Sequence, residues 1–130
     1  MLTLRRTRHL RAQLPLPGGE RLDVDLDVAA HLPALIRAQN DLILTARAPE
    51  GGSAESGDSF YEAYRALLRI ALGSDGLNRA LAACDGALPV LCAQLDGWVA
   101  TALIPRIRAA SADRVRRCRA QARRMLRRAR

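Results

Sequence analysis

The distribution of charge divides this chain into two parts. Eleven of its 21 arginines lie between Arg106 and Arg130, where Asp113 is the single acid, so this segment carries a formal charge of about +10. Residues 1–104 hold ten arginines against twelve aspartates and glutamates, a balance of about −2. We therefore predict a compact, nearly neutral domain over residues 1–104 and a basic arm over residues 105–130 that seeks an acidic surface.

The composition of the apolar residues favours helices. Apolar residues make up 49% of the chain, and most of them are Leu, Ala and Val. Ala and Leu are the best helix formers, whereas the aromatic residues that favour strands are few: Phe60, Tyr61, Tyr64 and Trp98. The predicted fold class is mainly α, a small helical bundle with a short N-terminal β-hairpin and a basic C-terminal helical arm.

The hairpin is predicted from alternation between Leu10 and Val28. Leu22, Val24 and Leu26 alternate with acids, and residues 17–20 contain a Pro-Gly-Gly break before this run. Strict alternation places the aliphatic side chains on one face and the acids on the other, and Gly-Gly between two such runs is a turn signal. A lone two-stranded ribbon is marginal in water, so its apolar face must pack on the helices or on another chain.

Four helical segments follow in the sequence pattern. Asp27 can cap the first, which continues to about Arg47, although Pro33 in its first turns can shift its start. Residues 49–57 read as a mobile loop, after which Ser59 and Glu62 form a capping box that opens the second. Gly73 ends that helix, and a brief third helix runs from residues 74–75 to an Asp-Gly stop at 85–86. The last core helix occupies residues 88–103, with Pro89 in its first turn, and Pro105 kinks or restarts it.

Residue patterns that carry catalysis or bind metal are weak in this sequence. Asp23, Asp25 and Asp27 resemble the start of a calcium loop, but Val28 and Ala34 stand where that loop needs Gly and Glu. The acids are better explained as the solvated face of a strand, which could also dock a basic partner, including the arm of a neighbouring copy. The two histidines, His9 and His31, have no partner spacing that suggests a ligand set or a triad. We predict no enzyme, no metal and no cofactor.

Compartment is inferred from the cysteines and the apolar runs. Cys84, Cys92 and Cys118 match neither a disulfide framework nor a zinc site, so a reducing, cytoplasmic environment is expected. Two of them fall on apolar helix faces, where Cys acts as a small hydrophobe. No apolar run approaches the roughly 18 residues that a membrane span needs. The basic start lacks the hydrophobic stretch of a secretory signal, whereas an Arg-rich organelle transit segment stays open.

The arm is amphipathic if it is helical. Apolar residues recur there at steps of three and four residues: Val115, Cys118, Ala122, Met125, Leu126 and Ala129. The residues predicted to bind an acidic surface surround this stripe: Arg114, Arg116, Arg117, Arg119, Arg123, Arg124, Arg127, Arg128 and Arg130. Crowded like charges should fray the free helix, and nucleic acid, anionic lipid or an acidic protein helix are the candidate surfaces. A purely solubilising tail is the alternative.

The order of the parts carries a family resemblance. A small acidic ribbon ending at Asp27 is followed by one helix, a polar loop, the segment Phe60-Tyr-Glu-Ala-Tyr-Arg-Ala-Leu-Leu-Arg-Ile-Ala-Leu-Gly73, and a helix containing Leu-Pro-Val-Leu-Cys92-Ala-Gln-Leu-Asp-Gly-Trp-Val99. Over residues 10–104 this arrangement resembles the tail assembly chaperones of long-tailed bacteriophages. The basic extension departs from that family's pattern, because its short forms tend to stop soon after the last helix.

The resemblance implies a non-enzymatic, oligomerising protein that coats the helical tape measure protein in the host cytoplasm. The candidates for self-association or partner contact are then Leu91, Leu95, Trp98, Val99 and Leu103, although simple core packing is the preferred interpretation of the same residues. The alternative function is a small nucleic-acid-associated protein that binds phosphate non-specifically through the arm. Organellar assembly factors and basic-tailed ribosomal proteins share the physics of the arm and stay open as a third class.

Overall fold

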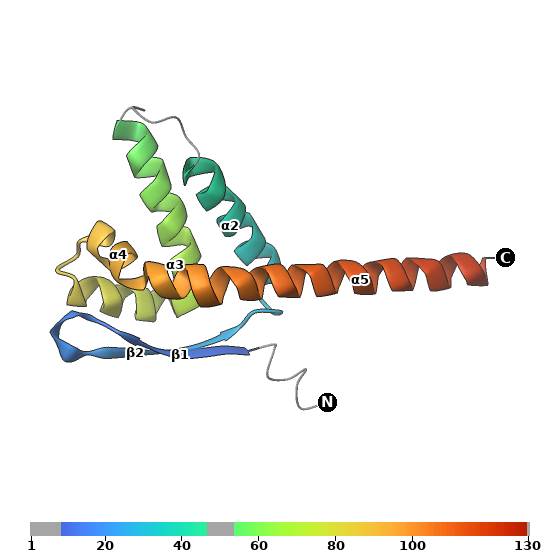
Figure 1. Ribbon diagram of the computed structural model, residues 1–130, viewed down its shortest axis with the longest axis horizontal. Coiled ribbons are helices and arrows are strands. Elements are labelled where there is room, and N and C mark those ends of the chain that lie inside the picture. The colour runs from blue at the N-terminus through green and yellow to red at the C-terminus, as the bar shows by residue number, and fades with distance from the viewer. Residues whose placement is uncertain (1–8, 47–53, 130) are drawn as a thin grey trace.

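The computed structural model describes residues 9–46 and 54–129 of the chain. Its elements follow in the order β1, η1, β2, α2, α3, α4, η2 and α5. The helices gather at one end around a common core, and α5 projects far beyond them (Figure 1). The predicted fold class, mainly helical with a short N-terminal hairpin, is confirmed.

The hairpin forms where the alternating pattern predicts it. β1 (His9–Pro15) and β2 (Arg21–Asp27) pair antiparallel, with Leu10 opposite Leu26 and Leu14 opposite Leu22. These apolar residues are buried together with Val24. The turn contains the 3₁₀ segment η1 (Pro17–Gly19), in which Gly18 has φ 82° and Gly19 has φ 80°. Only glycine adopts such angles freely, which explains the Gly-Gly pair at this turn.

Two side chains tie the hairpin to the helices. Gln94 donates a hydrogen bond to the carbonyl of Pro15 at 3.1 Å, and Arg106 donates one to the carbonyl of His9 at 3.3 Å. The apolar face of the ribbon packs on the helices, and its residues belong to the same buried cluster as theirs. The apolar face of the hairpin is therefore covered by its own chain, while its acidic face is largely exposed.

Helix α2 spans Leu32–Ala46 and begins later than Asp27 would require for capping. The Asp27 carboxylate instead accepts a hydrogen bond from the backbone N–H of Ala30 at 3.1 Å, in the turn that precedes the helix. The prediction of Asp27 as the cap of the helix is wrong for this reason. A side chain can satisfy only a nearby N–H, and Pro33 shifts the first helical turn away from Asp27.

Helix α3 spans Ala54–Ala83 and combines the predicted second and third helices. Ser59 lies inside it, so the capping box at Ser59 and Glu62 is wrong, as is the loop prediction for residues 54–57; residues 47–53 lie outside the described part. Each residue added to an existing helix gains one hydrogen bond, so the helix extends on the N-terminal side of Ser59 in spite of the capping signal there. The predicted break is confirmed, because Gly73 has φ 77° and ψ 161°, which are not helical angles.

Helix α3 is followed by Asp85 and Gly86, which both have left-handed backbone angles. Gly86 donates a hydrogen bond to the carbonyl of Leu81 at 2.7 Å, and Asp85 donates one to the carbonyl of Ala82 at 3.2 Å. Asp85 has φ 55° and Gly86 has φ 77°. This is the Schellman arrangement, and it confirms the Asp-Gly stop.

A long helix follows and carries the chain out of the body. α4 (Leu88–Trp98) has Pro89 in its first turn, and the π-helical segment η2 (Val99–Leu103) connects it to α5 (Ile104–Arg128). The N–H of Ile104 bonds to the carbonyl of Val99, five residues earlier. The wider turn lies directly before Pro105, whose missing N–H would interrupt a regular ladder, so the proline marks a π-helical turn inside a continuous helix.

The core extends past residue 104. Leu67, Leu68, Leu91 and Leu103 are fully buried, and Ile107 on α5 is exposed by only 1%. Ile107 belongs to the same buried cluster as the helices and hairpin, and α2 packs against α5. The first turns of α5 are thus part of the packed body. The division of the chain at residue 104 stays a prediction.

Candidate partner-binding surface

The apolar stripe proposed for self-association lies in the core. Leu91, Leu95, Val99 and Leu103 are each at most 2% exposed, and Trp98 is half-buried. A side chain covered by its own chain cannot form an intermolecular contact without unfolding. The preferred interpretation of this stripe as core is therefore confirmed, and a partner surface has to be sought elsewhere.

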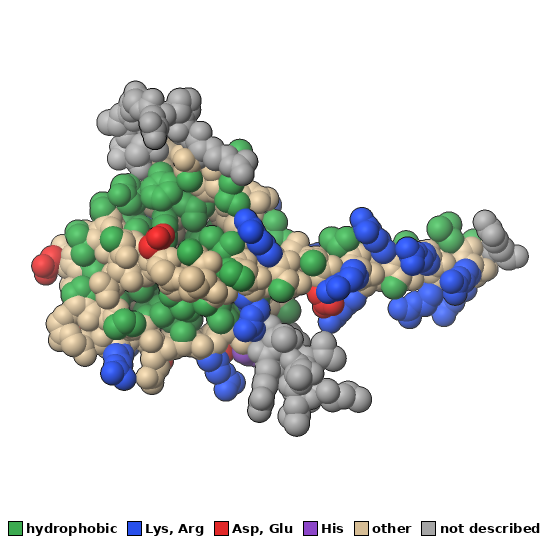
Figure 2. Space-filling model, viewed as in Figure 1, with side chains coloured by type: hydrophobic (Ala, Val, Ile, Leu, Met, Phe, Trp, Pro, Cys, Tyr) green, Lys and Arg blue, Asp and Glu red, His purple; other side chains and the backbone are tan. Residues whose placement is uncertain are grey.

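The projecting part of α5 is exposed on every side. All described residues from Arg114 to Ala129 are exposed, and Figure 2 shows this part of the helix standing clear of the body, with both apolar and basic side chains along it. Large apolar side chains are among them: Val115 is 45% exposed, Met125 63% and Leu126 68%. Together with Cys118 and Ala122 they form one face, which we call the arm stripe (Val115, Cys118, Ala122, Met125 and Leu126).

Basic side chains cover the remaining faces of the projecting helix. Residues 114–129 contain eight arginines and no acid. The predicted acidic-surface residues that the structure describes are all exposed on this helix: Arg114, Arg116, Arg117, Arg119, Arg123, Arg124, Arg127 and Arg128. Arg130 lies outside the described residues. The helix is therefore a cationic rod with one apolar side.

Asp113 is placed where the rod leaves the body. Its carboxylate lies 2.9 Å from Arg117 and 3.9 Å from Arg116, one turn further along α5. Pairs of this kind support a helix by about 0.2–0.5 kcal/mol each, which is small beside the repulsion among the remaining arginines. The charge of the rod is thus little reduced by its own chain.

A groove runs between α2 and α5 at the base of the rod. Its volume is about 630 Å³, and its walls include Ile36 and Gln39 from α2 and Ile107, Ser111 and Val115 from α5. Gln39 is the buried polar residue of the described chain, at 8% exposure, and within that part its Oε1 has no hydrogen-bond partner. This groove was not predicted from the sequence. The available signal was a Gln on the apolar face of a helix beside Leu35 and Leu42.

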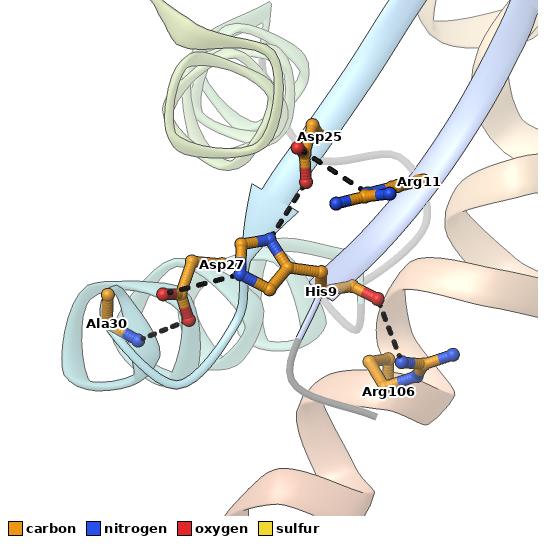
Figure 3. Close-up of polar contacts among 6 residues, drawn as sticks. All are labelled: His9, Arg11, Asp25, Asp27, Ala30 and Arg106. Carbon is orange, nitrogen blue, oxygen red and sulfur yellow. Dashed lines mark hydrogen bonds and ion pairs between the residues drawn. The ribbon is translucent and has the colours of Figure 1, made fainter. Parts of the chain in front are cut away.

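The acidic face of the hairpin is occupied by its own basic residues. His9 Nδ1 lies 2.9 Å from Asp25 Oδ1, and its Nε2 lies 3.9 Å from Asp27 (Figure 3). Arg11 lies 3.6 Å from the second oxygen of Asp25. The hydrogen bond from His9 and, to a smaller extent, the charge of Arg11 lower the pKa of Asp25 below its usual value of 3.8. Over residues 9–46 and 54–129 no group of three or more His, Cys, Asp or Glu side chains is placed to hold a metal ion.

The cysteines differ in their surroundings. Cys84 and Cys92 are buried and Cys118 is exposed, and all three are free thiols. Burial raises the pKa of the Cys92 thiol to about 11, and burial also raises that of Cys84. A raised pKa leaves these thiols protonated and unreactive at neutral pH. The prediction that two cysteines serve as small hydrophobes is confirmed for Cys84 and Cys92.

The membrane expectation needs one correction. Within the described chain, the helix Leu88–Arg128 contains an 18-residue window that is apolar enough to cross a membrane by length and composition, although its apolar residues do not form one continuous run. Core residues such as Leu91 and Leu103 belong to this helix, and a core helix can pass the same test. The window by itself is weak support for a membrane location.

Comparison with known proteins does not test the resemblance to phage tail assembly chaperones. No protein-family model, no curated protein and no solved structure matches this chain.

Proposed function

We propose that this chain is a non-enzymatic binding and assembly protein that holds a helical, acidic protein partner along the projecting part of α5. The role agrees with the one implied by the resemblance to phage tail assembly chaperones, in which the partner is the tape measure protein and several copies act together in the host cytoplasm. Here the contact is made by the arm stripe and not by the buried residues of α4 and η2.

The observation that supports this proposal is the exposure of the arm stripe. Val115, Met125 and Leu126 stand in solvent on one face of a regular helix. Burying such a side chain against a partner contributes about 1.5–3 kcal/mol when burial is complete. A purely solubilising tail or a simple phosphate-binding tail gains nothing from an apolar face, whereas a partner helix requires one.

The charge around the stripe selects the partner. Two copies of the rod would bring their arginines together, which opposes pairing of α5 with itself. A helix with apolar residues on one face and glutamates or aspartates beside them would bury the stripe and neutralise the flanking arginines. Charge complementarity therefore favours an acidic amphipathic helix.

The test uses a synthetic 21-residue helical peptide. Its Leu residues are spaced alternately three and four positions apart, so that they lie on one face, and all other positions are Glu. Binding to the full chain is measured by fluorescence anisotropy. The variant Met125→Ser/Leu126→Ser should weaken binding at least tenfold, because the apolar contact is removed and the charge is kept. The control Ala109→Ser/Ala120→Ser changes exposed alanines of α5 outside the stripe and should leave the affinity unchanged. Equal affinities for the two variants would refute the proposal.

A second candidate function is favoured by the eight exposed arginines of residues 114–129. A cationic rod of this kind can contact nucleic acid phosphates, with a loss of affinity in salt of slope about −0.9 per phosphate contact. Replacing Arg123, Arg124, Arg127 and Arg128 by Gln should lower retention on heparin and on duplex DNA and reduce that slope. If the stripe variant retained full DNA binding while the peptide failed to bind at all, nucleic acid would become the favoured partner.

A further inference from the structure

The groove between α2 and α5 continues the arm stripe into the body. Ile107, Ser111 and Val115 follow one another at helical spacing on α5 and line the groove. The same face proceeds to Cys118, Ala122 and Leu126 on the projecting helix. From Ile107 to Leu126 the face is about 28 Å long at 1.5 Å per residue. A partner helix lying on the stripe would therefore run directly into the groove.

Gln39 places an unsatisfied hydrogen-bond acceptor in the groove. Its side chain is 8% exposed and lines the groove, while its Oε1 has no hydrogen-bond partner in the described part of the chain. A buried acceptor without a donor is costly, and native proteins rarely keep one without a reason. The last torsion of a glutamine is soft, so its amide can turn toward a donor that enters the groove.

The charge at the rim of the groove is positive. Arg108, Arg116 and Arg119 line it from α5, and none of the residues that line it is acidic. Asn40 and Ser111 add polar groups that can donate or accept hydrogen bonds. The lining of the groove thus offers an entering helix cations, apolar side chains and an unsatisfied acceptor.

We propose that the groove between α2 and α5 is the docking site for one end of an acidic amphipathic helix of a protein partner, which donates a hydrogen bond to Gln39. The proposal rests on the proposed function and adds to it the site, the contribution of α2 and the need for a donor. In this arrangement the groove binds one end of the partner helix, and the arm stripe on the projecting part of α5 binds the rest of it.

The experiment uses the full chain and a variant of the acidic peptide described above, in which Ser replaces Leu at three successive positions that face the stripe. Ser111→Trp fills the groove and should weaken binding about tenfold. The control Ala109→Trp adds the same ring on an exposed face of α5 outside the groove and should not weaken it. Circular dichroism of both variants shows whether the fold is retained.

Gln39→Leu provides a test that does not depend on filling the groove. Leucine removes the unsatisfied acceptor, so the free protein should melt at a higher temperature, while the peptide should bind about fivefold more weakly because a hydrogen bond is lost. A residue with only a structural role would change the melting temperature without changing the affinity. In the unaltered protein, the side-chain amide resonances of Gln39 should shift when the peptide is added.

The possible outcomes separate the inference from the proposed function. If Met125→Ser/Leu126→Ser weakens binding but Ser111→Trp and Gln39→Leu do not, the rod binds the partner and the groove does not. If none of these variants changes the affinity, both proposals fail. Shifts of the Gln39 amide produced by duplex DNA, or by increasing the protein concentration alone, would assign the groove to nucleic acid or to a second copy and overturn this inference.

Discussion

The Tyr64 hydroxyl donates a hydrogen bond to the Asp96 carboxylate at 3.0 Å and so connects α3 to α4. Burial, with Asp96 beside it, raises the pKa of Tyr64 far above its usual value of 10.0. Because the neutral phenol is the form that the fold favours, this contribution to stability is fully present below pH 10 and decreases as the pH rises above that value. The bond therefore contributes to the fold throughout the neutral range.

Replacing Tyr64 with Phe should lower the free energy of unfolding by about 1–3 kcal/mol, since the bond is partly buried and its acceptor is charged. Urea denaturation at pH 7 measures this loss. Tyr61→Phe, on the same helix, should cost less than Tyr64→Phe. An equal loss for the two tyrosines would show that the Tyr64–Asp96 bond contributes nothing of its own.

The interstrand pair of His9 and Asp25 predicts a specific change in pKa. Replacing His9 with Ala removes the hydrogen bond that is the largest cause of the lowered pKa of Asp25, so this pKa should rise toward 3.8. Carboxyl NMR titration measures it directly. His31→Ala is the control. His31 is exposed in the turn before α2, so its replacement should leave the pKa of Asp25 unchanged. Since the folded-state pKa is the lower one, the stabilisation is present above pH 3.8 and is lost as the pH falls through the folded value.

The buried stripe of α4 should respond to substitution as a core does. Leu95→Ala should lower the free energy of unfolding by about 2–5 kcal/mol, because a cavity replaces a side chain that is 1% exposed. Val90→Ala, on the same helix but 50% exposed, should cost about 0.5 kcal/mol or less. Light scattering on Leu95→Ala under folding conditions should show an unchanged oligomeric state. If the oligomeric state changed and the stability did not, Leu95 would have to be part of an interface between copies and not of the core.

Two glycines should respond in opposite directions to the same substitution. Gly73 has φ 77° and ψ 161°, so Gly73→Ala should destabilise the protein by about 1–3 kcal/mol even though no atom lies within 4 Å of the added methyl group. Gly97 lies in α4, also with nothing within 4 Å, and Gly97→Ala should stabilise the helix by about 0.5–1 kcal/mol. Thermal unfolding measures both. A neutral Gly73→Ala would mean that α3 can straighten at this point without cost.

Much of the fold follows from local sequence. Alternation over Leu22–Leu26 and the Gly-Gly turn determine the hairpin and its register, because one slipped residue would expose every aliphatic side chain. The Asp-Gly pair at residues 85–86 ends α3 through left-handed backbone angles that few other residues adopt. The start of α3 was not predictable in this way. A capping signal at Ser59 competes with helix growth, and local pattern does not say which prevails.

The sequence by itself determined the segregation of charge and the two amphipathic faces, one around Leu95 and one around Val115 and Leu126. Only the tertiary structure decided that the first is core and the second is exposed, because periodicity identifies a face but not what covers it. The hairpin and α3 belong to the packed body and cover the first face. In the described chain, α5 projects beyond every other element, so nothing covers the second. The groove beside Gln39 was decided in the same way, since it depends on how closely α2 approaches α5 and not on either helix alone.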